Sequence, residues 1–176
     1  MKSLSIYLAG PEVFLPDGYQ VLQNHKRLCE SRGFVAFTPL DGELPPEMKR
    51  DLSMAKRIFE VNCELIRKSD IIIANCNFFR GACTDDGTAF EIGYGFSLGK
   101  KIWGYRNSLV PLHQITAEII PTTDHDSGYK MDANGYLLNE DFGNAINLML
   151  EFSISQSGGK LILGGLTEVL NELAGS

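Results

Sequence analysis

The sequence predicts an α/β fold with a mostly parallel sheet, and three observations lead to this prediction. Strand-like apolar runs and helix-like segments alternate four times between residues 4 and 105. The run IIIANC at residues 71–76 is typical of a parallel strand covered by helices on both faces. Glycine and proline separate the segments, as at Gly10-Pro11. A single domain over residues 1–176 is expected, because a chain of this length can bury a large core.

The expected strands are short apolar runs that end at turn-forming residues. The first of them, LSIYLA, stops at Gly10-Pro11. Right-handed crossovers would place the carboxyl ends of all these strands at one edge of the sheet, where α/β proteins bind their ligands. The expected strands cover residues 4–9, 34–37, 71–76 and 102–105.

The expected helices have apolar residues three and four positions apart. In the first helix Tyr19, Leu22 and Leu28 show this spacing, and Gly33 follows as a C-terminal stop. The second helix repeats the pattern from Leu52 onward. The expected helices cover residues 17–32, 46–68, 87–99 and 141–151.

Two further segments have a different character. Residues 107–139 are polar and rich in turn formers, which predicts an irregular insertion that is either functional or mobile. Residues 156–176 form a C-terminal extension with a glycine joint, a short apolar run and a final amphipathic helix.

Composition and charge exclude several kinds of partner. The chain is 44% hydrophobic and 22% charged, which is typical of a globular domain. Its net charge is −6 and it has no basic stripe, so a nucleic-acid partner is not expected. No run approaches the ~20 apolar residues of a membrane span, so a membrane partner is not expected either. The four cysteines have no C-x-x-C spacing, which indicates reduced thiols and a cytoplasmic location.

Glu91 is a lone charge inside an apolar, glycine-dotted segment. Phe90 and Ile92 flank it and leave little polar face for a solvated surface glutamate, which is the alternative interpretation. One helical turn earlier Gly87 has no side chain, so a ligand could come close to the carboxylate. We expect Glu91 to be ionised at neutral pH without special tuning and to act as a nucleophile or base on a sugar, or as a metal ligand.

Two acids, Asp85 and Asp86, precede the helix that carries Glu91. Either can cap the helix N-terminus, and Thr88 is placed to help in the first turn. One of the two acids is therefore expected to be only a cap.

Other chemistries lack their sequence signals. The three histidines have no metal-ligand spacing, and neither a G-x-S-x-G nor a G-x-G-x-x-G motif is present. We therefore expect no metal and no cofactor. Tyr7 and Phe14 are either core aromatics or side chains that cover a sugar or a base, and Asn62 and Asn147 are amides that belong to structural networks or to a site.

Four segments together resemble the nucleoside 2-deoxyribosyltransferase family: IYLAGPEVF, SDIIIANCNFFRG, DDGTAFEIGYGFSLGKKI and DFGNAINLML. The resemblance covers roughly residues 4–150, and its most specific part is the D-x-G-T-A-x-E-x-G-Y block. It implies a flavodoxin-like three-layer α/β sandwich. It also implies an enzyme of nucleoside salvage that transfers 2-deoxyribose between purine or pyrimidine bases, with net retention at C1', through a covalent intermediate on a glutamate.

The resemblance also implies roles for individual residues. Glu91 corresponds to the nucleophile, and Asp85 to the carboxylate that holds the substrate. The expected substrate-binding residues are Tyr7, Phe14, Glu43, Asn62, Gly87, Asn147 and Met149. Asn147 and Met149 correspond to residues that come from a neighbouring subunit in the family, which implies a homo-oligomer with shared sites. The expected partners are 2'-deoxynucleosides and free bases.

Some positions differ from the family pattern and keep alternatives open. Asn62 stands where some members carry an aspartate, and an amide cannot act as a general acid. Glu43 stands where some members have a glutamine that recognises the base. One alternative function is an N-glycoside hydrolase that acts on deoxynucleosides or deoxynucleotides, and another is a non-catalytic nucleoside-binding domain.

Overall fold

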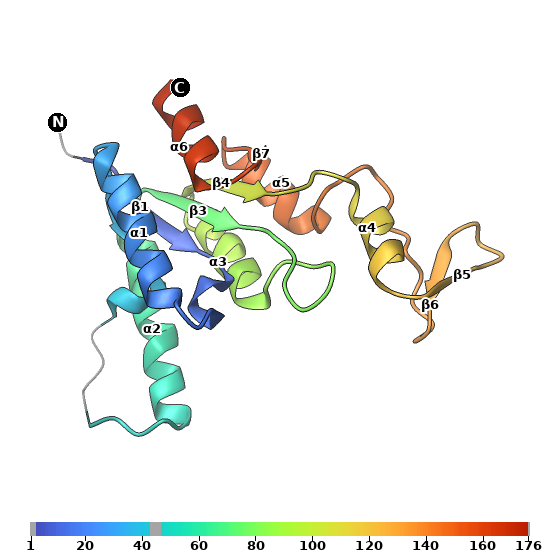
Figure 1. Ribbon diagram of the computed structural model, residues 1–176, viewed down its shortest axis with the longest axis horizontal. Coiled ribbons are helices and arrows are strands. Elements are labelled where there is room, and N and C mark those ends of the chain that lie inside the picture. The colour runs from blue at the N-terminus through green and yellow to red at the C-terminus, as the bar shows by residue number, and fades with distance from the viewer. Residues whose placement is uncertain (1–2, 43–46, 176) are drawn as a thin grey trace.

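Five parallel strands form the central sheet of the computed structural model, which describes residues 3–42 and 47–175 (Figure 1). The strand order is β2-β1-β3-β4-β7, the order of a flavodoxin-like sheet. The fold predicted from the sequence is thereby confirmed, and the C-terminal extension adds the edge strand β7. The strands are β1 (Ser5–Ala9), β2 (Val35–Phe37), β3 (Ile71–Asn75), β4 (Lys101–Arg106) and β7 (Leu161–Leu163).

Helices cover both faces of this sheet. One face carries α1 (Gly18–Ser31) and α6 (Leu166–Gly175), which contribute buried residues to one core cluster with Ile6 and Trp103 of the strands. Strand residues alternate between the two faces, so the neighbouring Tyr7 belongs to the opposite cluster. That cluster is completed by the helices α2 (Leu52–Lys68), α3 (Asp86–Ser97) and α5 (Leu148–Gln156).

The start of α2 differs from the predicted helix of residues 46–68. Residue 46 lies outside the described part of the chain, and residues 47–51 are not helical. The helix begins at Leu52 because the Asp51 side chain accepts hydrogen bonds from the backbone N–H groups of Ser53 and Met54. The apolar pattern alone contains no such boundary.

The predicted helix of residues 141–151 is wrong in its bounds. Gly143 has a φ of +85°, which interrupts a right-handed helix. Asn147 then caps α5 through a hydrogen bond from the backbone N–H of Met149 at 3.1 Å. The helix therefore runs from Leu148 to Gln156.

Residues 107–147 form a projection, which we call the arm (Figure 1). The sequence predicted an irregular insertion at 107–139, but this part contains α4 (Leu112–Ile119) and a hairpin of β5 (Thr122–Asp124) and β6 (Lys130–Asp132). The arm extends away from the sheet in Figure 1 and returns to it at α5. Its two ends meet where the N–H of Leu112 donates to the carbonyl oxygen of Asn144 at 2.9 Å.

Candidate active site

Glu91 lies on α3 with its side chain turned into the protein, and 9% of the residue is exposed. Tyr7, on β1, donates a hydrogen bond from its hydroxyl group to Oε1 of Glu91 at 2.5 Å. The contact forms because Tyr7 faces the side of the sheet that α3 covers. The structure thus brings together two of the residues that the sequence singled out.

Burial raises the pKa of Glu91 to about 8. The nearby charges of Asp85 and Glu12 raise it further, whereas the hydrogen bond from Tyr7 lowers it. The expectation of a carboxylate that is ionised at neutral pH without tuning is therefore wrong, because the helix withdraws it from water. Burial also raises the pKa of Tyr7, so this residue stays a neutral donor.

Asp85 is the N-terminal cap of α3. Its Oδ2 accepts hydrogen bonds from the backbone N–H of Thr88 at 2.9 Å and from the Thr88 hydroxyl at 3.0 Å. Asp86 is exposed and receives only the N–H of Gly87 among the residues described. Of the two paired acids, the one that the resemblance assigns to the substrate is therefore the one that caps the helix.

Gly87 fits closely beside this cap. A Cβ atom at Gly87 would lie 3.1 Å from Oδ2 of Asp85, which is closer than an ordinary contact. The missing side chain therefore leaves room for the Asp85 carboxylate.

A cavity of about 370 Å³ lies between α2 and the segments that follow β1 and β2. Phe14 and Asn62, both predicted as site residues, line it with apolar side chains such as Leu40 and Val61. Val61 belongs to the same core cluster as Tyr7. Oδ1 of Asn62 is buried and has no hydrogen-bond partner among the described residues. Glu43, which was also predicted as a substrate-binding residue, lies outside the described residues.

Asn147 and Met149 lie at the start of α5, apart from the Glu91–Tyr7 contact. The Asn147 amide donates to the carboxylate of Glu140 at 3.3 Å, and its oxygen caps α5. Met149 is 68% exposed. Within one chain the Asn147 side chain contacts its own segment, and the Met149 side chain is exposed.

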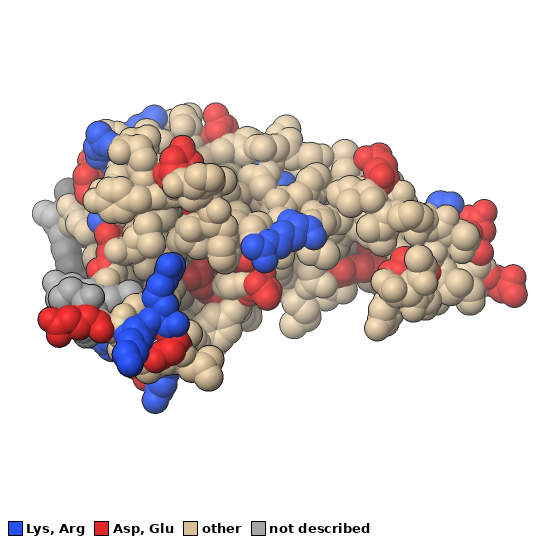
Figure 2. Space-filling model, turned by 60° about the horizontal axis from the view of Figure 1, so that its bottom comes forward, with Lys and Arg blue, Asp and Glu red and all other residues tan. Residues whose placement is uncertain are grey.

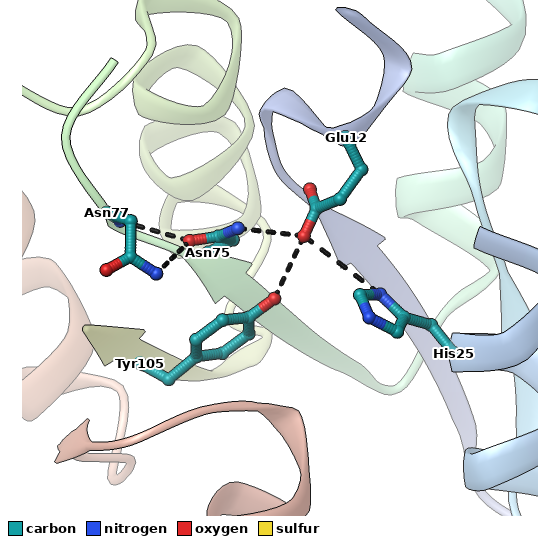
Figure 3. Close-up of polar contacts among 5 residues, drawn as sticks. All are labelled: Glu12, His25, Asn75, Asn77 and Tyr105. Atoms are coloured by element: carbon teal, nitrogen blue, oxygen red, sulfur yellow. Dashed lines mark hydrogen bonds and ion pairs between the residues drawn. The ribbon is translucent and has the colours of Figure 1, made fainter. Parts of the chain in front are cut away.

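Glu12 is a buried carboxylate close enough to influence Glu91, and the sequence analysis did not single it out. It follows β1 in the short 3-10 segment η1 (Pro11–Phe14) and is only 6% exposed. Figure 3 shows its Oε1 at the centre of three contacts: Nδ2 of Asn75 at 2.8 Å, the hydroxyl of Tyr105 at 3.0 Å and Nδ1 of His25 at 4.0 Å. The available signal was an acid three residues after the end of the first strand, directly behind Gly10-Pro11.

Arg106 is a second residue that the sequence analysis missed. It ends β4 and is 1% exposed. Its guanidinium donates to the carbonyl oxygens of Ala82, at 3.0 Å, and of Ala145, and it lies 4.3 Å from the ring centre of Phe78. Arg106 therefore joins the loop that precedes Asp85 to the base of the arm.

The described residues can be compared with the features of a metal site, a membrane span and a basic surface. Within residues 3–42 and 47–175, no group of three or more His, Cys, Asp or Glu side chains could hold a metal ion. No helix in these ranges is both long and apolar enough to cross a bilayer. On the face shown in Figure 2, some Lys and Arg side chains lie together at the lower left beside acidic ones, and the others stand apart.

The fold and the site define a flavodoxin-like α/β protein with a buried, hydrogen-bonded carboxylate near the carboxyl ends of its strands. The family model described as nucleoside 2-deoxyribosyltransferase matches residues 6–149. The chain therefore belongs to the nucleoside 2-deoxyribosyltransferase family, as the sequence motifs indicated.

Three relatives illustrate this membership. An uncharacterised protein of Schizosaccharomyces pombe is 30% identical over 166 residues, which cover 88% of this chain and 78% of that protein. The structure of a 2-deoxyribosyltransferase from Leishmania mexicana is 30% identical, covers 84% of this chain and 85% of its own, and superposes with a TM-score of 0.62. The 2-deoxyribosyltransferase of Bacillus psychrosaccharolyticus shares the fold at 24% identity and a TM-score of 0.52, over 66% of this chain and 82% of its own.

Proposed function

We propose that the protein transfers the 2-deoxyribosyl group between nucleobases through a covalent intermediate on Glu91. The observation that carries the proposal is the buried Glu91 carboxylate with the Tyr7 hydroxyl 2.5 Å away. A carboxylate that attacks a sugar must be ionised and held in one orientation. The hydrogen bond from Tyr7 serves both needs, since it favours the ionised form and fixes one oxygen.

The reaction has two displacements at the same carbon. Glu91 forms a bond to C1' of the deoxynucleoside while the bond from C1' to the base nitrogen breaks, and the base leaves with a proton from an acid or from water. A second base then attacks C1' with its ring nitrogen, gives up a proton and displaces the Glu91 oxygen. Each step inverts C1', so the product retains the original configuration. No cofactor enters either step.

The cavity beside α2 supports a place for the base. Its walls are mostly apolar, which suits a flat ring, and Phe14 lies at its edge with 57% exposure. Oδ1 of Asn62 offers a buried acceptor that a base N–H group could satisfy. We assign Asn62 and Phe14 to the base and Asp85 to the sugar. Tyr7 acts on Glu91 itself.

The surface around Asn147 supports a site shared between two copies of the chain. Apolar side chains are exposed beside it: Phe142 is 73% exposed and Phe152 57% exposed. Helix α5, which begins just after Asn147, packs against α3, the helix that carries Glu91. A second copy on this surface would bury these side chains and would bring Asn147 and Met149 to the partner's site.

The decisive experiment is incubation of the protein with thymidine and adenine. Base exchange would yield deoxyadenosine and thymine. Release of free deoxyribose at the same rate with and without adenine would instead identify a hydrolase. Saturable nucleoside binding without cleavage of either kind would leave a binding domain and contradict the proposal.

The pH dependence of exchange gives a first prediction. Because kcat/KM reports ionisations of the free enzyme, it should rise with pH and level off above about 8, the pKa of Glu91. Tyr7→Phe removes the hydrogen bond that lowers this pKa, so the rise should move to higher pH and kcat/KM at pH 7 should fall about tenfold. An unchanged midpoint in the Tyr7→Phe profile would contradict the role given to Tyr7.

Mixed oligomers give a second prediction. Glu91→Gln and Asn147→Ser variants should each be impaired alone. After the two are mixed at equal amounts and allowed to exchange subunits, about a quarter of the sites should be intact and activity should return. Serine is chosen because it can still cap α5 but lacks the amide donor. Failure to recover activity, once subunit exchange is shown with labelled protein, would argue against shared sites.

A further inference from the structure

Glu12 is a buried carboxylate that the proposed reaction does not use. Its Oε1 receives Nδ2 of Asn75 and the hydroxyl of Tyr105, two donors from neighbouring strands (Figure 3). Its Oε2 lies over the end of β1, where a Cβ on Gly10 would come within 2.1 Å of it. The carboxylate therefore fits against the edge of the sheet only because residue 10 is glycine.

Asn75 connects Glu12 to Asn77 along the carboxyl edge of the sheet. Because Nδ2 of Asn75 is held by Glu12, its Oδ1 faces Asn77 and accepts from the backbone N–H at 3.0 Å and from Nδ2 at 2.7 Å. Oδ1 of Asn77 in turn accepts from the N–H of Asn107 at 2.9 Å. We call this series of contacts, from Glu12 through Asn75 and Asn77 to Asn107, the relay.

The relay connects the three segments that carry the proposed site. The first follows β1 and contains Phe14, whose ring stacks on Phe79 with centroids 5.1 Å apart. The second follows β3, contains Phe79 and ends at Asp85. The third follows β4 at Asn107 and forms the arm, which leads to Asn147.

We infer that Glu12 is a positioning residue that, through Asn75 and Asn77, holds these three segments closed around the reacting carbon. A charged acceptor is suited to this task because it strengthens the hydrogen bond that it accepts from Asn75. The inference rests on the proposed function for its catalytic consequence. A covalent sugar on Glu91 can react with a base or with water, so segments that fit loosely would admit water and favour hydrolysis.

The ratio of base exchange to hydrolysis tests this inference. Glu12→Gln keeps the size of the side chain and removes its charge, and should lower the ratio about tenfold. Asn75→Ala interrupts the relay without changing Glu12 and should have the same effect. A ratio is insensitive to the amount of folded protein, so a variant that merely folds less well would leave it unchanged.

Two control variants separate the relay from the loss of any polar group. Tyr105→Phe removes a donor to Glu12 that lies outside the relay, and should leave the ratio near the wild-type value. Asp70→Asn changes a carboxylate at the amino ends of β1 and β3, the edge of the sheet opposite to Glu12. There Oδ2 of Asp70 accepts from the N–H of Ser5 at 2.8 Å. Asp70→Asn should also leave the ratio unchanged. A wild-type ratio in Glu12→Gln or Asn75→Ala, or an equal fall in both controls, would overturn the inference.

Hydrogen exchange of backbone amides tests, independently of activity, whether Glu12 holds the relay in place. The N–H groups of Asn77 and Asn107 are both held by relay side chains. In Glu12→Gln they should exchange about tenfold faster, and in Asp70→Asn at the wild-type rate. Unchanged exchange at both amides in Glu12→Gln would overturn the inference. If the wild-type protein cleaves no nucleoside, the proposed function fails and the exchange rates still decide whether the relay exists.

Discussion

Replacement of Glu91 with glutamine is expected to reduce base exchange by at least about 10³-fold. The amide has nearly the shape of the carboxylate and can still accept the hydrogen bond from Tyr7, but it cannot form the bond to C1'. Exchange should be measured with thymidine and adenine, and the labelled sugar should no longer become attached to the protein. Normal turnover in the Glu91→Gln variant would eliminate Glu91 as the nucleophile.

The same variant should be at least as stable as the wild-type protein. The pKa of Glu91 is about 8 in the folded protein against 4.5 for an ordinary glutamate, so the folded state keeps a proton that the unfolded chain releases between these values. Wild-type stability contributed by this group is present below pH 4.5 and is lost as pH rises toward 8. The glutamine variant has no such loss, and its advantage should grow to at most about 5 kcal/mol above pH 8. Urea unfolding at pH 5 and pH 8.5 measures this difference, and a variant less stable at both pH values would show that the carboxylate supports the fold.

Replacement of Arg106 with methionine is expected to lower the free energy of unfolding by about 3 kcal/mol. Methionine fills part of the same volume but leaves the carbonyl oxygens of Ala82 and Ala145 without their donor in a buried place. The loop before Asp85 and the base of the arm would then lose their common attachment. Exchange activity should fall as well, because Asp85 and Asn147 are carried by these two segments.

Arg32→Met is the matched control for this substitution. Arg32 is exposed and donates to Oδ1 of Asn171 at 2.8 Å, so its loss should change stability by less than about 0.5 kcal/mol. Denaturant titrations of both variants provide the comparison. Equal destabilisation would show that burial of Arg106 does not determine its effect.

The parallel sheet could be predicted from the sequence because its strands have a local signature. The run at β3 is apolar from Ile71 to Ala74, and the apolar residues of the helices recur at a regular spacing, so the existence and order of these elements follow from short windows of sequence. The bounds of α2 and α5 could not be predicted in this way. They depend on which side chain caps the first turn, Asp51 and Asn147, and on the positive φ of Gly143. The arm contains a helix and a hairpin that polar composition did not reveal.

Sequence reasoning singled out some of the residues that the structure brings together, for a physical reason. Glu91 stood out because a charge inside an apolar helix is unusual, and the structure gives it the Tyr7 partner. The pKa of Glu91 could not be foreseen, because it depends on burial by elements distant in the sequence. Glu12 and Arg106 were missed since each acts by joining segments that only the folded chain brings together.

Because the arm is closed at its base, its length does not affect the geometry of the candidate site. The N–H of Leu112 and the carbonyl of Asn144 meet at 2.9 Å, and Arg106 holds the neighbouring Ala145 against β4. The chain thus leaves the sheet and returns to it at one place, where the two ends of the arm meet. The free-energy cost of closing such a loop changes by only about 0.6 kcal/mol for each doubling of its length. The part of the arm between Leu112 and Asn144 can therefore be lengthened, shortened or replaced while Glu91 and its neighbours keep their positions. The arm is therefore the part of the molecule best suited to acquiring new contacts without loss of chemistry.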